Sequence, residues 1–131
     1  MPTLFLVLFI VSLFPMVLAI LGGFLRKKQF GKFDNKQPRL QQAHMTGLGA
    51  RVMAAQQNAW EALIFYSVVC LLAYISGLNF ASFALPAGLF LMSRIFHALF
   101  YILDMDVYRS LVFFIGWFSC LYIAVQALMA F

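Results

Sequence analysis

The sequence predicts an all-α membrane protein, a bundle of four transmembrane helices, and two observations support this prediction. Of the 131 residues, 65% are hydrophobic and only 10% are charged, whereas charged residues make up about a quarter of an ordinary soluble domain. The apolar residues also gather in four stretches, each close to the ~20 residues that a helix needs to cross the hydrocarbon core of a bilayer. We therefore expect residues 1–131 to form a single transmembrane domain.

The four helices are expected at about residues 2–25, 50–75, 80–103 and 108–131, with a long basic loop at 26–49. The loop carries six basic residues against one acidic residue, and this difference of +5 equals the net charge of the whole chain. By the positive-inside rule the loop is cytoplasmic, so both termini lie outside. A basic segment between two membrane helices indicates contact with lipid headgroups, and no nucleic-acid partner is expected.

Two charged residues are expected inside the membrane-spanning segments. Between Ala62 and Ile75 the second helix has only 14 residues, too few to span, so its polar start must enter the bilayer with Glu61. Arg94 interrupts the third helix and, like Glu61, is expected about 8 to 10 Å below the cytoplasmic boundary. An unpaired charge at that depth costs roughly 2.5 to 3.5 kcal/mol, so we expect an ion pair or a hydrated pocket.

Helical spacing extends this polar zone. Arg51, Asn58 and Glu61 fall on one face of the second helix, with Gln56 at its margin and Gln57 pointing elsewhere. Arg94, His97 and Tyr101 are spaced three and four residues apart, so they share a face of the third helix. Arg109 enters the fourth helix at the mouth of the same region. The zone thus gathers three arginines around one glutamate, and an anion would balance the excess positive charge.

A purely structural interpretation stays open for each of these residues. Glu61 and Arg94 can form an interhelical ion pair, while Asn58 and Gln56 can hydrogen-bond neighbouring helices. His97 can be a buried core histidine, and Tyr101 can lie at the membrane interface as many tyrosines do. No spacing typical of metal ligands is present, and no metal is expected.

The pattern R51-x6-N58-x2-E61, followed by R94-x2-H97-x3-Y101 and then R109, resembles the family of membrane-associated proteins in eicosanoid and glutathione metabolism, the MAPEG family. The resemblance covers essentially the whole chain and is closest to microsomal glutathione transferases, with a bacterial member expected. It implies a homotrimer in the cytoplasmic (inner) membrane that binds glutathione between subunits near the cytoplasmic face. It also implies the roles of the site residues: glutathione binding by Arg51, Gln56, Asn58, Glu61, Arg94, His97 and Tyr101, and stabilisation of the glutathione thiolate by Arg109.

The function that the resemblance implies is a glutathione-dependent transferase or peroxidase acting on hydrophobic electrophiles. A thiol with a pKa near ~8.5 is a weak nucleophile until a nearby cation favours the thiolate, and Arg109 would be that cation. Two positions depart from well-known members: Ala54 replaces an arginine, and Ala62 replaces an aromatic residue. A non-catalytic lipid-binding or scaffold protein of the same family is therefore an alternative, and a small proton-coupled exporter built around Glu61 is a third.

Overall fold

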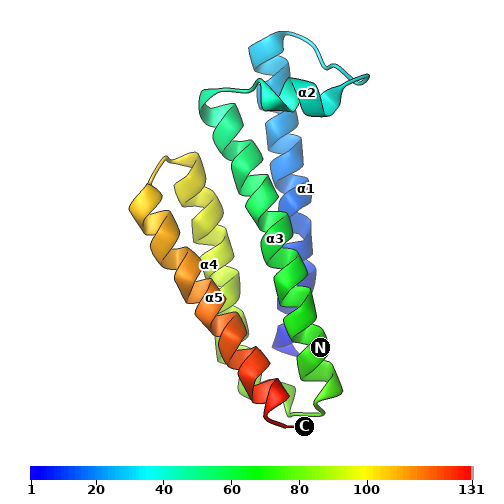
Figure 1. Ribbon diagram of the computed structural model, residues 1–131, viewed down its shortest axis with the longest axis vertical. Helices are drawn as coiled ribbons and strands as arrows, with labels where there is room; N and C mark the ends of the chain where they lie inside the picture. The colour runs from blue at the N-terminus through cyan, green and yellow to red at the C-terminus, as the bar shows by residue number, and fades with distance from the viewer. Residues whose placement is uncertain (131) are drawn as a thin grey trace.

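The structure, a computed structural model, describes residues 1–130, and their regular secondary structure is entirely helical. Four long helices run side by side, and both termini lie at one end of the bundle (Figure 1). The short helix α2 lies across the opposite end, which we call the loop end. The elements in order are α1 (Thr3–Phe30), α2 (Pro38–Ala43), α3 (Gly47–Ile75), a 3₁₀ turn η1 (Phe80–Phe83), α4 (Ala84–Ile102) and α5 (Asp106–Leu128).

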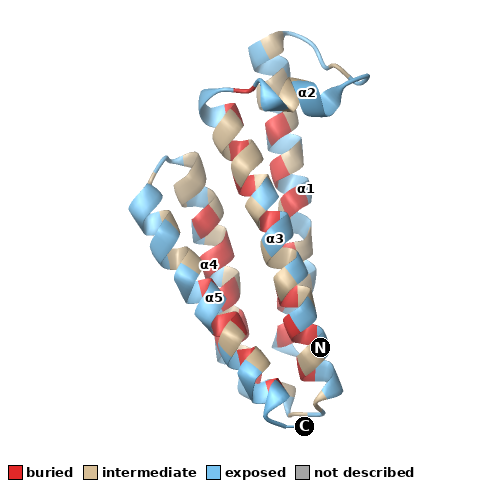
Figure 2. Ribbon diagram, viewed as in Figure 1, coloured by how far each residue is buried: buried red, intermediate tan, exposed pale blue. Residues whose placement is uncertain are grey.

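The outer surface of the bundle is apolar along its length. The long helices each contain a stretch long and apolar enough to cross a membrane, with η1 continuing α4. Large hydrophobic side chains such as Phe9, Leu71 and Tyr122 are exposed on it, and exposed residues alternate with buried ones along each of the four long helices (Figure 2). In water such a surface would be unfavourable, so it is the surface of a multi-pass membrane protein that faces lipid or other subunits.

The helices pack as two pairs, α1 with α3 and α4 with α5. The pairs meet at the end that carries the termini and diverge toward the loop end (Figure 1). The larger hydrophobic cluster includes Leu4, Val11, Tyr66, Phe90 and Ile123 and joins all four long helices. A second, smaller cluster, centred on α1 and α3, lies nearer the loop end. The polar residues of the sequence pattern therefore occupy the part of the bundle where the helix pairs have separated.

The loop is shorter and more ordered than the sequence predicts. Helix α1 continues to Phe30, beyond the expected end near residue 25, and Gly31 ends it in the left-handed conformation with φ 74°. Its N–H donates to the Lys27 carbonyl oxygen at 2.9 Å, a common way to close a helix. Lys27 and Lys28 lie in the last turn, where positive charge is favourable, so these lysines stabilise the end of the helix.

The remaining loop is folded by side-chain hydrogen bonds. The Asp34 carboxylate accepts from the backbone N–H groups of Lys36 and Gln37 at 2.9 and 3.0 Å. The Gln41 side chain accepts from the Asp34 N–H and donates to the Lys32 carbonyl oxygen. Helix α3 then begins at Gly47, slightly before the expected residue 50. Because such bonds depend on individual polar side chains in a segment without apolar periodicity, hydropathy alone does not predict them.

Candidate functional site

A polar chain of three side chains links α3 to α4 and runs from buried Arg94 to exposed Glu61. Arg94 on α4 is buried, with 6% of its surface exposed, and its Nη1 donates to Asn58 Oδ1 at 3.0 Å. Asn58 Nδ2 lies 3.5 Å from Glu61 Oε2, one helical turn further along α3. The expected interhelical contact thus exists, but within residues 1–130 it is no direct Glu61–Arg94 ion pair. Asn58 lies between the two charges and contacts both.

One of the two glutamines at the start of this segment does not behave as its helical position predicts. Gln57, expected to point away, reaches one turn along α3, and its Nε2 donates to Glu61 Oε1 at 3.4 Å. A flexible side chain at position i can reach a residue at i+4. A helical wheel shows only the direction in which each side chain leaves the backbone, so it does not predict this contact. Gln56 has a buried side-chain oxygen that finds no partner within the described part of the chain.

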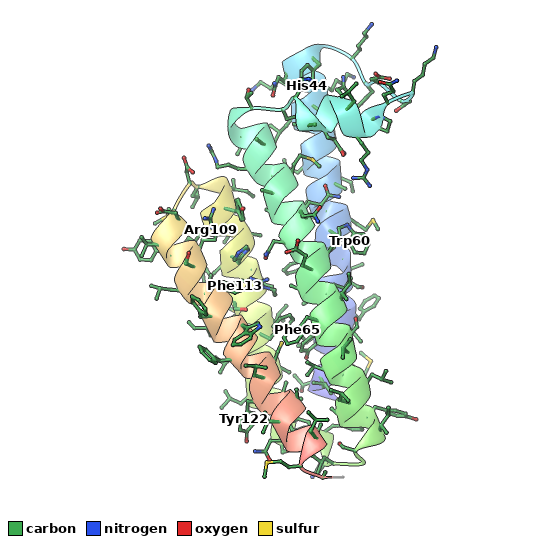
Figure 3. All side chains as sticks on the ribbon, in the orientation of Figure 1. His44, Trp60, Phe65, Arg109, Phe113 and Tyr122 are labelled. Atoms are coloured by element: carbon green, nitrogen blue, oxygen red, sulfur yellow. The ribbon has the colours of Figure 1, made fainter. Side chains whose placement is uncertain are left out.

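Arg109 lies beside a second group of predicted residues. Its guanidinium stands over the Tyr101 ring, 4.2 Å from the ring centre, and the His97 and Tyr101 rings meet edge to face at 5.5 Å. These three residues and Asn58 line a cavity of about 260 Å³, together with Ser110, Phe113 and Phe114; we call it the arginine pocket. Figure 3 places Arg109 and Phe113 along α5, with Arg109 nearer the α4–α5 turn.

A neighbouring cavity of about 200 Å³ lies deeper in the bundle, and we call it the aromatic cavity. Its polar lining consists of Asn58, Glu61 and Arg94. Its apolar lining consists of Ala62, Phe65, Phe90, Phe113, Gly116 and Trp117. Asn58 and Phe113 line both cavities, so the two spaces adjoin between α3 and α5.

Arg51 lies apart from both cavities, at the loop end of α3. Its Nη1 lies 3.5 Å from Asp104 Oδ2, and the two side chains form an ion pair. Arg51 Nε also donates to the Ile102 carbonyl oxygen at 3.3 Å. Asp104 lies in the α4–α5 turn, and its own backbone is left-handed with φ 63°. An aspartate tolerates this conformation better than most residues. In this conformation Arg51 binds the turn between α4 and α5.

The structure therefore brings together Asn58, Glu61, Arg94, His97, Tyr101 and Arg109, whereas Arg51 and Gln56 lie outside the two cavities. The sequence pattern missed Ser110, Phe113 and Trp117 as lining residues. The spacing held a signal for Phe113 alone, because it follows Arg109 by four residues and so shares its helical face. No group of three potential metal ligands occurs among residues 1–130.

Comparison with known proteins supplies the family. The chain matches the model of the MAPEG family over residues 3–129. This protein belongs to the MAPEG family. A search of curated proteins and a search of solved structures each gave no match. The family assignment covers nearly the whole chain and confirms both the resemblance drawn from the polar pattern and the predicted bundle of four membrane helices.

Family membership also defines a general role. MAPEG proteins use glutathione as a substrate, so membership supports a function in glutathione-related or eicosanoid metabolism at the membrane. It does not by itself assign a reaction, because one fold supports several activities. The reaction has to be argued from the residues around the two cavities.

Proposed function

We propose that this MAPEG protein is a glutathione-dependent transferase or peroxidase that acts on hydrophobic electrophiles. The observation that carries the proposal is the position of Arg109. It stands over Tyr101 at the rim of a cavity lined also by His97 and Asn58, and among residues 1–130 it forms no ion pair. An arginine that is not neutralised by a carboxylate is available to stabilise an anion.

The residues around the two adjoining cavities suit the chemistry of glutathione. The tripeptide has two carboxylates, one ammonium group, peptide groups and a thiol, so it needs cations, one anion and several hydrogen-bonding groups. Arg94 and Arg109 would supply positive charge, Glu61 would supply the negative charge for the ammonium group, and Asn58 would supply an amide. Arg94 also has two buried nitrogens, Nε and Nη2, without a partner among the described residues. A bound acceptor would satisfy such donors.

Arg109 would favour the thiolate of bound glutathione. A positive charge near the sulfur lowers the thiol pKa from its reference value near ~8.5, which raises the fraction of thiolate at neutral pH. Arginine does not titrate in this range, so its effect stays constant with pH. The thiolate would then attack the electrophilic atom of a lipid-soluble substrate or reduce a hydroperoxide.

The test is a glutathione titration of the detergent-purified protein, followed by thiolate absorbance and by conjugation of a model aromatic halide. We expect Arg109→Ala to lower kcat/KM by about 100-fold, as the loss of one preorganised charge-stabilising group typically does. The pH–rate profile should shift toward higher pH, because the thiol then ionises nearer its reference value. Arg39→Ala, which removes an equal charge from the exposed loop, is the control. Absence of glutathione binding at millimolar concentration would overturn the proposal.

We further propose a homotrimer in the bacterial cytoplasmic membrane, with the loop end in the cytoplasm and both termini outside. The concentration of positive charge in the loop supports the orientation. Glu61 supports the assembly, because it is exposed on the surface of an isolated bundle at a depth where an ionised side chain requires partners. Mass measurement of the detergent-solubilised protein tests the trimer, and labelling of single cysteines in the loop tests the orientation.

A non-catalytic lipid-binding or scaffold role is the second candidate, and one observation favours it. Arg51, which the sequence pattern assigns to glutathione, is already bound to Asp104 and to the Ile102 carbonyl oxygen. If this arrangement persists with ligand present, glutathione has fewer contacts than in the proposed enzyme. Weak glutathione binding without conjugation or peroxide reduction by the wild-type protein would support this second function.

A further inference from the structure

The aromatic cavity is not explained by glutathione alone. Its deep part is walled by Phe65, Phe90, Phe113 and Trp117, which come from three different helices. Ala62, which also lines the cavity, has a small side chain that leaves space between these rings. A polar tripeptide would gain little from such walls, whereas an apolar ring would stack on them.

We propose that the aromatic cavity binds an uncharged ring compound that carries a carbonyl group, a quinone. The glutathione thiolate would add to a ring carbon and the ring would take up one proton, which gives a hydroquinone thioether without a leaving group. As the second substrate of the reaction this ligand rests on the proposed function, but its binding does not require glutathione. The volume supports a single ring, since a cavity of about 150 Å³ suffices for benzene and this one measures about 200 Å³.

The charges at the polar end of the cavity explain why the ligand is uncharged. This end contains one cation, Arg94, and one anion, Glu61, with Asn58 hydrogen-bonded between them. Their formal charges cancel, and in the proposed complex they face one ammonium group and one carboxylate of glutathione. A second ligand with a charge of its own would therefore lack a counter-ion in the membrane-embedded part of the bundle. An uncharged ligand avoids this cost.

Arg94 explains why the ligand carries a carbonyl group. The guanidinium group donates hydrogen bonds and accepts none, and Arg94 Nε and Nη2 are buried without a partner among residues 1–130. Buried donors of this kind cost about 1 to 3 kcal/mol each until an acceptor reaches them. A carbonyl oxygen on the ring is such an acceptor, and it would direct that edge of the ring toward α4.

Trp117 lies where a ligand would enter the cavity from the bilayer, and its fluorescence can report binding. It lines the cavity and is also 40% exposed on the outer surface, so the cavity borders the region that lipid or a neighbouring subunit occupies. A ligand dissolved in the bilayer would thus pass beside this residue. The chain has two tryptophans, and Trp60 is not among the residues that line the cavity.

The experiment measures tryptophan fluorescence in detergent, without glutathione, while a short-chain benzoquinone is added. In Trp60→Phe, which retains Trp117, we expect saturable quenching, because the ring stacks beside the indole. In Trp117→Phe, which retains Trp60, we expect only the weak, non-saturating quenching caused by quinone in the micelle. Equal saturable quenching of both variants, or none in either, would overturn the proposal.

A second pair of variants tests the position of the ligand. On the Trp60→Phe background, Ala62→Phe fills the cavity and should weaken quinone binding about tenfold or more. Ala54→Phe adds the same side chain about two turns earlier on α3, outside the cavity, and should leave binding unchanged. Circular dichroism and gel filtration check the fold, and Ala62→Leu replaces Ala62→Phe if the larger side chain prevents folding. Unchanged affinity in the folded cavity-filling variant would contradict the assignment.

The two proposals fail separately. If quinone binds but glutathione does not, the cavity is a ligand site and the proposed reaction is wrong. If glutathione binds and its thiolate forms but quinone does not quench Trp117, the reaction stands and its second substrate binds elsewhere.

Discussion

The two ends of the helix bundle differ in how their interiors are filled. At the end that carries the termini, Tyr66 and Phe90 stack with ring centres 4.2 Å apart, and Tyr66 donates to the Leu4 carbonyl oxygen at 3.2 Å. Toward the loop end, polar side chains and two cavities lie between the helices. Helix α3 takes part in both regions. The same helix therefore anchors the fold with one half and lines the candidate site with the other.

This difference explains how a small membrane bundle can contain a polar site. Lipid provides little hydrophobic driving force for packing of helices, so close contact and hydrogen bonds hold a bundle together. The packed end supplies these contacts through a continuous cluster from all four long helices. The loop end can then remain partly open, with Arg94 and Glu61 joined through hydrogen bonds to Asn58.

The largest expected effect comes from breaking the packed end. Tyr66→Ala removes a fully buried ring, its stacking on Phe90 and its hydrogen bond to α1. We expect the free energy of unfolding to fall by about 4 kcal/mol, measured by titration with a denaturing detergent. Tyr66→Phe, which keeps the ring, should cost about 1 kcal/mol. A small loss for Tyr66→Ala would show that this end does not anchor the bundle.

A smaller effect is expected from breaking the polar chain at the open end. Asn58→Leu leaves Arg94 Nη1 without its acceptor and Glu61 without one donor. Unsatisfied buried polar groups cost about 1 to 3 kcal/mol, so we expect the free energy of unfolding to fall by about 2 kcal/mol and glutathione affinity to fall with it. Val68→Leu, at an exposed apolar position on the same helix, is the control. Wild-type stability in Asn58→Leu would show that the polar chain is not structural.

The sequence predicts the packed end and the open end to different extents. Apolar stretches of membrane-spanning length are sufficient to place four helices, and the depth of Glu61 and Arg94 places two charges near each other on neighbouring helices. The partner of each charge depends on side-chain reach and on helix rotation, which spacing does not determine. For this reason Asn58 lies between the charges where an ion pair or a hydrated pocket was expected, and Gln57 contacts Glu61.

The cavities were less predictable than the polar residues. A cavity depends on the volumes of side chains from three helices at once, and no single helical pattern contains that information. In the sequence, Ala62 is only a departure from the family pattern, an alanine in place of an aromatic residue. In the structure it lines the aromatic cavity, so its small size has a direct consequence for the space available to a ligand.

The smallest expected effect concerns Arg51, the predicted site residue that the structure places outside the cavities. Its ion pair with Asp104 is largely exposed, with 32% and 72% of the two side chains accessible, and exposed pairs contribute only about 0.2 to 1 kcal/mol. If a glutathione carboxylate competes with Asp104 for Arg51, removing the aspartate charge should tighten glutathione binding. We expect Asp104→Asn to lower the glutathione Kd by about threefold, measured by calorimetry at low salt.

Asp106→Asn is the matched control, because it removes the same charge two residues away, from a carboxylate that accepts only from the Val107 N–H among the described contacts. Equal tightening in both variants would mean that the general field at the loop end, and not Arg51, attracts the anion. Weaker binding in Asp104→Asn would mean that the aspartate positions the α4–α5 turn, and with it Arg109, for the ligand. Because the two explanations predict opposite signs for the change in Kd, this small effect decides whether Arg51 belongs to the site at the open end or to the scaffold that holds it.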